Sequence, residues 1–77
     1  MHACGHDGHT AIGVNIAKTL AQFRDQLQGR IKFVFQPAEE TGDGARTMIS
    51  EKVLENPVPD MFLGIHLWNE LPVGTVA

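Results

Sequence analysis

The sequence predicts an α/β fold in which a mostly parallel sheet is flanked by helices. Two observations lead to this prediction. Helical and strand-like patterns alternate along the chain, and each strand-like segment is followed by turn residues. The order helix, strand, helix, strand is typical of folds whose strands run parallel. In such sheets ligands collect at the carboxyl ends of the strands, so residues that follow a strand are the first candidates for a functional site.

The first predicted helix follows a polar, glycine-containing loop over residues 1–9. From Thr10 onward apolar residues recur at spacings of four and three, which places them on one face of a helix of about five turns. These residues are Ile12, Ile16, Leu20, Phe23 and Leu27. Thr10 or Asp7 is expected to cap the start of the helix, and Gly29 is well placed to end it.

Three segments are predicted as strands. Residues 30–36 alternate between apolar and polar side chains, and Pro37 ends this strand because it has no amide hydrogen. Residues 61–67 are continuously apolar, which is typical of a strand buried on both faces, and residues 71–76 are the third candidate. A second helix is expected between the first two strands. Its apolar face contains Ala45, Met48, Ile49 and Val53.

Size and composition limit the possible functions. A chain of 77 residues is at most one small domain with a marginal core. The net charge of −3 and the scattered basic residues argue against nucleic-acid binding, and 43% hydrophobic residues exclude a disordered chain. There is no apolar run of roughly 18 residues and no signal-peptide pattern, so we expect a soluble, cytoplasmic protein without membrane contact. The lone Cys4 fits a reducing compartment or a metal-ligand role.

Cys4 and His6 are the first candidates for a functional site. A spacing of two points both side chains to the same side, and the glycine between them lets the backbone turn toward one centre. Thiolate and imidazole are zinc ligands. The alternative is a small buried cysteine beside a capping histidine. Nothing in the sequence fixes the role of His2 or His9, and Asp7 could either cap the helix or orient a ligand.

The adjacent carboxylates Glu39 and Glu40 follow the first predicted strand, and His66 ends the second. Two carboxylates in a partly buried site repel each other unless a proton or a cation intervenes. A dication bound to one carboxylate leaves the other free to accept a proton. Solvated loop carboxylates and a histidine packed at a strand edge are the simpler alternatives. Together with Cys4 and His6, however, these residues favour a site for zinc or a related ion, without showing which glutamate is the ligand.

Four motifs in the sequence occur in the order found in a known family. They are residues 1–10 (MHACGHDGHT), 35–40 (FQPAEE), 44–49 (GARTMI) and 64–68 (GIHLW). With these motifs the chain resembles the aminoacylase/carboxypeptidase-type metallo-amidohydrolases, over essentially all 77 residues. The closest branch contains hippurate hydrolase, N-acyl-amino-acid amidohydrolase and the indole-acetyl-amino-acid hydrolases. The resemblance implies a zinc-peptidase-like catalytic domain with two divalent ions, zinc or manganese first, with cobalt and nickel also suited.

Residue by residue, the resemblance implies that Cys4, His6, Glu40 and His66 are metal ligands and that Glu39 is the general base and acid. It also implies hydrolysis of the amide bond of small N-acyl amino acids by a homo-oligomer. Family members have several hundred residues and a lid or dimerisation domain. The chain lacks that domain and a further ligand histidine, so we expect residues 1–77 to be a fragment of the catalytic domain, inactive alone.

Two other functions remain open at this point. In the first, Cys4 is a nucleophile activated by a nearby histidine, which leaves Glu39, Glu40 and His66 without a role. In the second, the chain is a small metal-binding or self-associating module without turnover.

Overall fold

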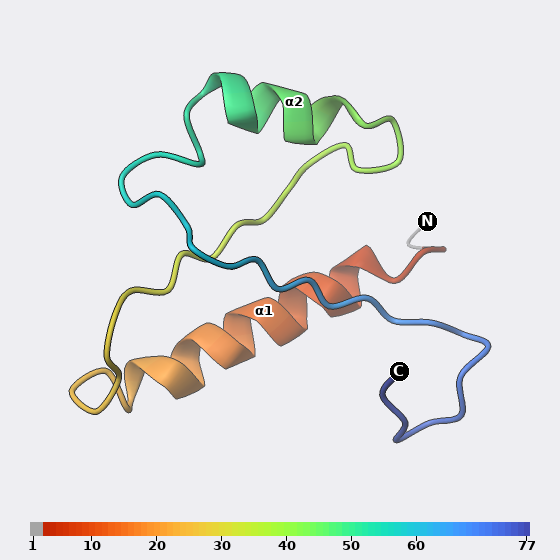
Figure 1. Ribbon diagram of the computed structural model, residues 1–77. Coiled ribbons are helices and arrows are strands. Elements are labelled where there is room, and N and C mark those ends of the chain that lie inside the picture. Colours follow the sequence, from red (N-terminus) through yellow and green to blue (C-terminus); the bar gives the residue numbers. More distant parts are fainter. Residues whose placement is uncertain (1–2) are drawn as a thin grey trace.

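The computed structural model describes residues 3–77 and contains two helices, α1 (His6–Ala21) and α2 (Asp43–Ser50). An irregular segment leads from α1 to α2, and a second one returns from α2 past α1 toward the C-terminus (Figure 1). Within the described residues no strand is formed. Neither helix has the length and apolar character needed to cross a membrane, as far as residues 3–77 are concerned.

Helix α1 begins earlier than the apolar pattern predicts. Its first residue is His6 instead of Thr10, and Gly5 precedes it in the left-handed conformation with φ 74°. The predicted caps are wrong: neither Asp7 nor Thr10 caps the helix, and Thr10 Oγ1 instead donates a hydrogen bond to the His6 carbonyl at 2.9 Å. Glycine adopts positive φ at little cost, so Gly5 can turn the chain into the helix. The first turn is polar, and an apolar period cannot reveal it.

The regular part of α1 ends at Ala21, well before Gly29. Beyond it the chain continues in tighter turns with i→i−3 hydrogen bonds. The Phe23 N–H donates to the Leu20 carbonyl at 3.0 Å, and the Gln26 N–H donates to the Phe23 carbonyl at 2.8 Å. The predicted five-turn helix is therefore a shorter helix followed by turns.

The three predicted strands have no ladder of hydrogen bonds in this structure. Residues 30–36, 61–67 and 71–76 are irregular. A strand requires a neighbour that pairs with its N–H and C=O groups, and none of the described segments provides one. The structure therefore does not test the α/β sheet, which stays a prediction from the sequence.

Lys32 joins the first irregular segment to the region after α2. Its ammonium group donates to the backbone carbonyls of Val53, Glu55 and Pro57 at 2.8, 2.7 and 3.1 Å. An ammonium group carries three hydrogens, and each of them has a carbonyl acceptor here. Lys32 thus connects two segments without strand pairing, one leading to Glu39 and Glu40 and the other leading to His66.

Helix α2 starts directly against the loop that carries the two glutamates. Gly44, in its first turn, is buried, and a Cβ added there would collide with the Pro37 carbonyl oxygen. The Gly42 N–H donates to the Glu39 carbonyl at 3.0 Å. The glycine at position 44 therefore permits the close approach that places Glu39 and Glu40 beside α2.

The described part of the chain encloses no hydrophobic core. None of its hydrophobic side chains is buried, and Met61, Phe62 and Leu63 are 84, 71 and 91% exposed. The accessible surface is 7091 Å², whereas a compact protein of this mass exposes about 4,600 Å². The radius of gyration of 14.4 Å also exceeds the value of about 11.5 Å for a compact domain of this length. The chain is open, with apolar segments in contact with solvent.

Candidate metal centre

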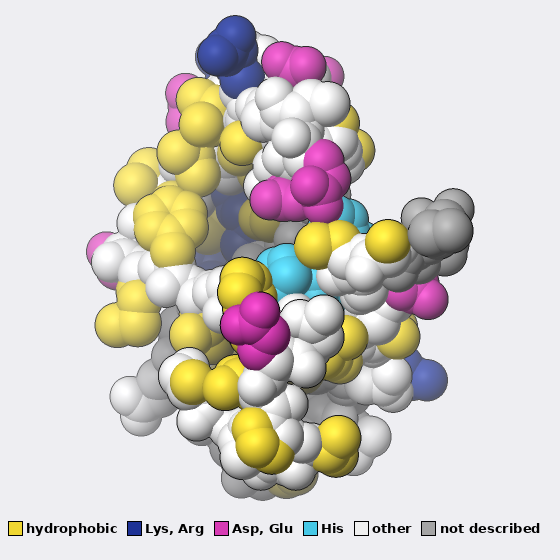
Figure 2. Space-filling model, turned by 90° about the vertical axis from the view of Figure 1, so that its right-hand side faces the viewer, with side chains coloured by type: hydrophobic (Ala, Val, Ile, Leu, Met, Phe, Trp, Pro, Cys, Tyr) yellow, Lys and Arg dark blue, Asp and Glu magenta, His cyan; other side chains and the backbone are white. Residues whose placement is uncertain are grey.

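All five predicted site residues lie around the N-terminal end of α1. They form two groups whose donor atoms lie within 4.8 Å of one another in each group. The first group contains Cys4, His6 and His66, and the second contains His6, Glu39 and Glu40. His6 belongs to both. We call these five residues the polar cluster, and Figure 2 shows histidine side chains beside acidic side chains on the face that carries it.

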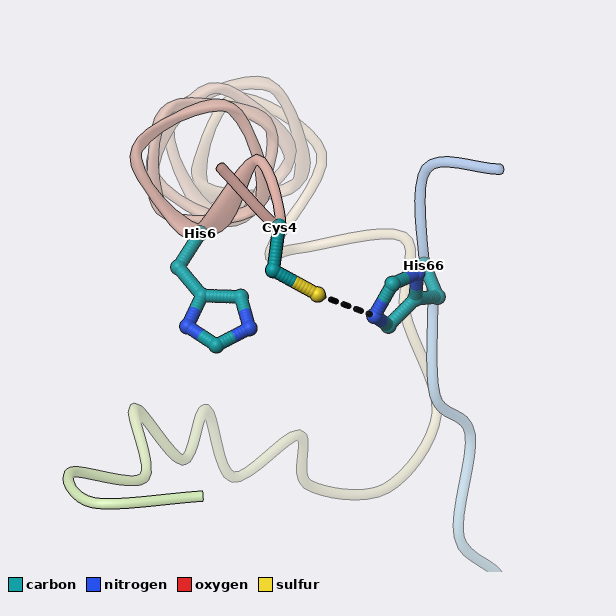
Figure 3. Close-up of side chains that lie close together, drawn as sticks. All are labelled: Cys4, His6 and His66. Carbon is teal, nitrogen blue, oxygen red and sulfur yellow. Dashed lines mark hydrogen bonds between the residues drawn. The ribbon is translucent and has the colours of Figure 1, made fainter. Parts of the chain in front are cut away.

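The donor atoms of the first group, Cys4, His6 and His66, are spaced like the ligands of one metal ion. The Cys4 thiol points toward the His66 ring, with Sγ 3.7 Å from Nε2 (Figure 3). Sulfur and nitrogen ligands of one tetrahedral zinc ion lie about 3.6 Å apart, from bond lengths of about 2.3 and 2.0–2.1 Å. The His66 Nδ1 lies 2.6 Å from the Leu67 carbonyl oxygen. A carbonyl only accepts, so Nδ1 carries the hydrogen and Nε2 is free to bind an ion.

The donor atoms of the second group, His6, Glu39 and Glu40, are also spaced like the ligands of one metal ion. His6 Nε2 lies 3.5 Å from Glu39 Oε2 and 3.5 Å from Glu40 Oε1. Nitrogen and oxygen ligands of one tetrahedral zinc ion lie about 3.4 Å apart. The two glutamates are equivalent in these distances, so the geometry does not distinguish the ligand from the base.

The surroundings of Cys4 keep its thiol protonated. Hydrogen bonding to Glu40 is the main cause that raises the pKa of Cys4, followed by burial and by the negative charges of Glu40 and Glu39. A cation bound between these groups would remove the same repulsion and take the place of the thiol proton.

His9 has a role that the sequence did not reveal. Its Nε2 accepts a hydrogen bond from the Leu67 N–H at 2.9 Å, and its ring centroid lies 4.3 Å from that of His66. Burial, followed by the nearby His66 and His6, lowers the pKa of His9, so the ring stays neutral and can accept. The available signal was its spacing of three from His6, which puts both on one face once the helix starts at His6. His2 lies outside the described residues.

A thiol, two imidazoles and paired carboxylates at one helix end form a donor set typical of metallohydrolases. A family comparison defines the class further. The chain belongs to the peptidase family M20/M25/M40, whose model matches residues 1–77. This is a family of enzymes that are generally metal-dependent.

Several relatives are similar over nearly the whole chain. The chain is 53% identical over 76 residues to the indole-3-acetyl-aspartic acid hydrolase of Enterobacter agglomerans. The chain is also 53% identical over 76 residues to one of the subunits of p-aminobenzoyl-glutamate hydrolase from Escherichia coli. It is 50% identical over 76 residues to the N-acetylcysteine deacetylase of Bacillus subtilis. Each alignment covers 99% of this chain but only 17%, 17% and 20% of the respective relative, so the chain spans about one fifth of their length or less. No solved structure matches it significantly.

Proposed function

We propose that a complete protein carrying this chain hydrolyses the amide bond of N-acyl amino acids, and that the polar cluster is part of its metal centre. The observation that carries the proposal is the convergence of the donor atoms at metal-ligand spacing. The names of the relatives supply the substrate class. Indole-3-acetyl-aspartate, p-aminobenzoyl-glutamate and N-acetylcysteine each join an acyl group to the nitrogen of an amino acid.

Cys4, His6, Glu40 and His66 would hold the metal, with zinc or manganese as the expected ions and cobalt or nickel as alternatives. Two bound ions would polarise the amide carbonyl and make water more acidic. Glu39 would accept a proton from the attacking water and return it to the departing nitrogen. One C–O bond forms and the C–N bond breaks, which gives a carboxylic acid and a free amino acid.

The fold of the complete protein is part of the proposal. We assign residues 30–36 and 61–67 to strands of a mostly parallel sheet, because their patterns suit strands and because Glu39, Glu40 and His66 follow them. The 77-residue chain alone, which forms neither a sheet nor a core over residues 3–77, would bind metal and self-associate but would not turn over substrate.

A cysteine nucleophile is the competing mechanism. The 3.7 Å contact between Cys4 Sγ and His66 Nε2 resembles a thiol–imidazole pair. Reactive cysteines, however, have a lowered pKa, whereas the environment raises the pKa of Cys4. This direction argues against an activated nucleophile in the metal-free chain.

Metal analysis tests the proposal directly. Cys4→Ser and His66→Ala, placed in a full-length relative, should each lower the zinc or manganese content. Chelation should abolish turnover of an N-acyl amino acid, and added metal should restore it. Undiminished metal in both variants would contradict the ligand assignment, and full activity after complete metal removal would support the cysteine nucleophile instead.

A further inference from the structure

We infer that His9 is a positioning residue of the metal centre, which holds the main chain beside His66 at the distance where His66 and Cys4 can share one ion. The inference rests on the proposed metal site and assigns a role to a residue outside the ligand set. Its basis is the hydrogen bond from the Leu67 N–H to His9 Nε2 at 2.9 Å, between residues 58 positions apart.

The side chain of Leu67 makes a second attachment to the same helix. A Cβ added at Gly8 would lie 2.8 Å from Leu67 Cδ1, and one added at Gly5 would lie 3.4 Å from it. The Leu67 side chain therefore lies against Gly5 and Gly8 at the start of α1, while the Leu67 N–H donates to His9. An apolar contact and a hydrogen bond together hold Leu67 in place.

These attachments act on the ligand pair because of their place in the chain. Cys4 precedes the first turn of α1 by two residues, and His66 immediately precedes Leu67. Movement of Leu67 away from α1 would therefore lengthen the 3.7 Å separation between Cys4 Sγ and His66 Nε2. Among the described residues, no other backbone group of segment 61–77 bonds to α1.

The same hydrogen bond argues against His9 as a ligand. Its Nε2 lone pair is directed at the Leu67 N–H, so that nitrogen is not available to a metal ion. Residues that orient metal ligands typically change metal affinity by about 10–100-fold when they are removed. This range sets the size of the expected effect.

The test is a Co²⁺ titration of the 77-residue chain, followed by the thiolate-to-cobalt charge-transfer band. His9→Leu removes the acceptor and should weaken Co²⁺ binding by about 10–100-fold. His9→Gln keeps an acceptor at similar reach and should recover most of the affinity. Gln22→Leu, a change of polar side chain at the other end of α1, is the matched control and should bind as the parent does.

A second readout does not depend on metal. Hydrogen exchange of the Leu67 amide should be faster in His9→Leu than in the parent or in His9→Gln. Parent-like Co²⁺ affinity in His9→Leu would overturn the inference, and so would equal losses in His9→Leu and His9→Gln. Cys4→Ser separates the two proposals: if it abolishes the charge-transfer band while His9→Leu binds normally, only the role of His9 fails. A parent chain that binds no Co²⁺ overturns the inference about His9, whereas the proposal for the complete protein stands or falls with the metal content of the full-length variants.

Discussion

The residues of the polar cluster lie close together in this structure, whereas the apolar segment Met61–Leu63 has no described residues packed around it. The cluster gathers donor atoms from three distant parts of the sequence into two groups, and within each group these atoms lie within 4.8 Å of one another. The apolar segment, from the same returning stretch of chain that delivers His66, is almost fully exposed. Polar side chains can be placed by a few directed contacts, such as those of Lys32 and His9. Apolar burial instead requires a surrounding surface of other residues. A chemical site can therefore assemble where a core does not.

The largest expected effect distinguishes the two glutamates, which the distances leave equivalent. Glu39→Gln in a full-length relative keeps the shape but removes the proton acceptor, so turnover should fall by about 10²–10⁴-fold while metal content persists. Glu40→Gln is the matched variant and should lose metal. Steady-state kinetics and metal analysis measure both. A loss of less than tenfold in Glu39→Gln would exclude Glu39 as the base.

The exposed apolar segment should cause self-association of the 77-residue chain. Burial of one large apolar side chain contributes about 1.5–3 kcal/mol, so the double variant Met61→Lys/Leu63→Lys should shift the chain toward monomer. Its Co²⁺ stoichiometry per chain should not change, because the polar cluster is untouched. Light scattering measures the association, with Gln22→Lys as the control for added charge. A parent chain that stays monomeric at all concentrations would refute this prediction.

A substitution at Gly44 tests whether the close contact between α2 and the loop that carries the glutamates stabilises the chain. Alanine in a helix is ordinarily more stable than glycine by about 1 kcal/mol. Here the added Cβ would collide with the Pro37 carbonyl, so Gly44→Ala should instead destabilise the chain by about 1–3 kcal/mol. Urea unfolding followed by circular dichroism measures the change. Gly64→Ala, where no atom lies within 4 Å of the added Cβ, is the control. Greater stability in Gly44→Ala would show that the contact is absent.

The smallest effect concerns pH. The pKa of Cys4 is raised, chiefly by hydrogen bonding to Glu40, so the thiol carries its proton at neutral pH in the metal-free chain. Binding of a cation displaces that proton, and the apparent affinity should rise by about tenfold per pH unit below the Cys4 pKa. Thiolate absorbance should locate this pKa above the ordinary value and show its decrease in Glu40→Gln. A titration at or below the ordinary value would contradict the environment described for Cys4.

The sequence suggested which residues could form a site, and the structure brings the donor atoms of those residues together in two groups. The sheet that the sequence suggested is not tested by the structure. Cys4, His6, Glu39, Glu40 and His66 could be proposed because their chemistry is a property of the residue types and of their places near element ends. The early start of α1 could not, because its first turn is polar. The role of His9 was missed for the same reason, since its spacing from His6 has meaning only inside a helix.

The predicted strands illustrate a different limit. An alternating or continuous apolar pattern indicates which segments suit a sheet, but the ladder depends on a neighbouring strand that the pattern does not contain. In residues 30–36 the observed connection to a distant segment is instead made by a side chain, because Lys32 donates to the carbonyls of Val53, Glu55 and Pro57.

The contact between Cys4 and His66 joins residues 62 positions apart, nearly the two ends of the chain. An ion bound by both would therefore act as a cross-link as well as a cofactor, closing a loop that contains most of the sequence. By analogy with a disulfide, closing a loop of this length reduces the entropy of the unfolded chain by the equivalent of about 4 kcal/mol. This is a large fraction of ordinary folding stability, in a chain whose described residues bury no hydrophobic side chain. Metal loading would then stabilise the folded chain, and a chelator would make it easier to unfold.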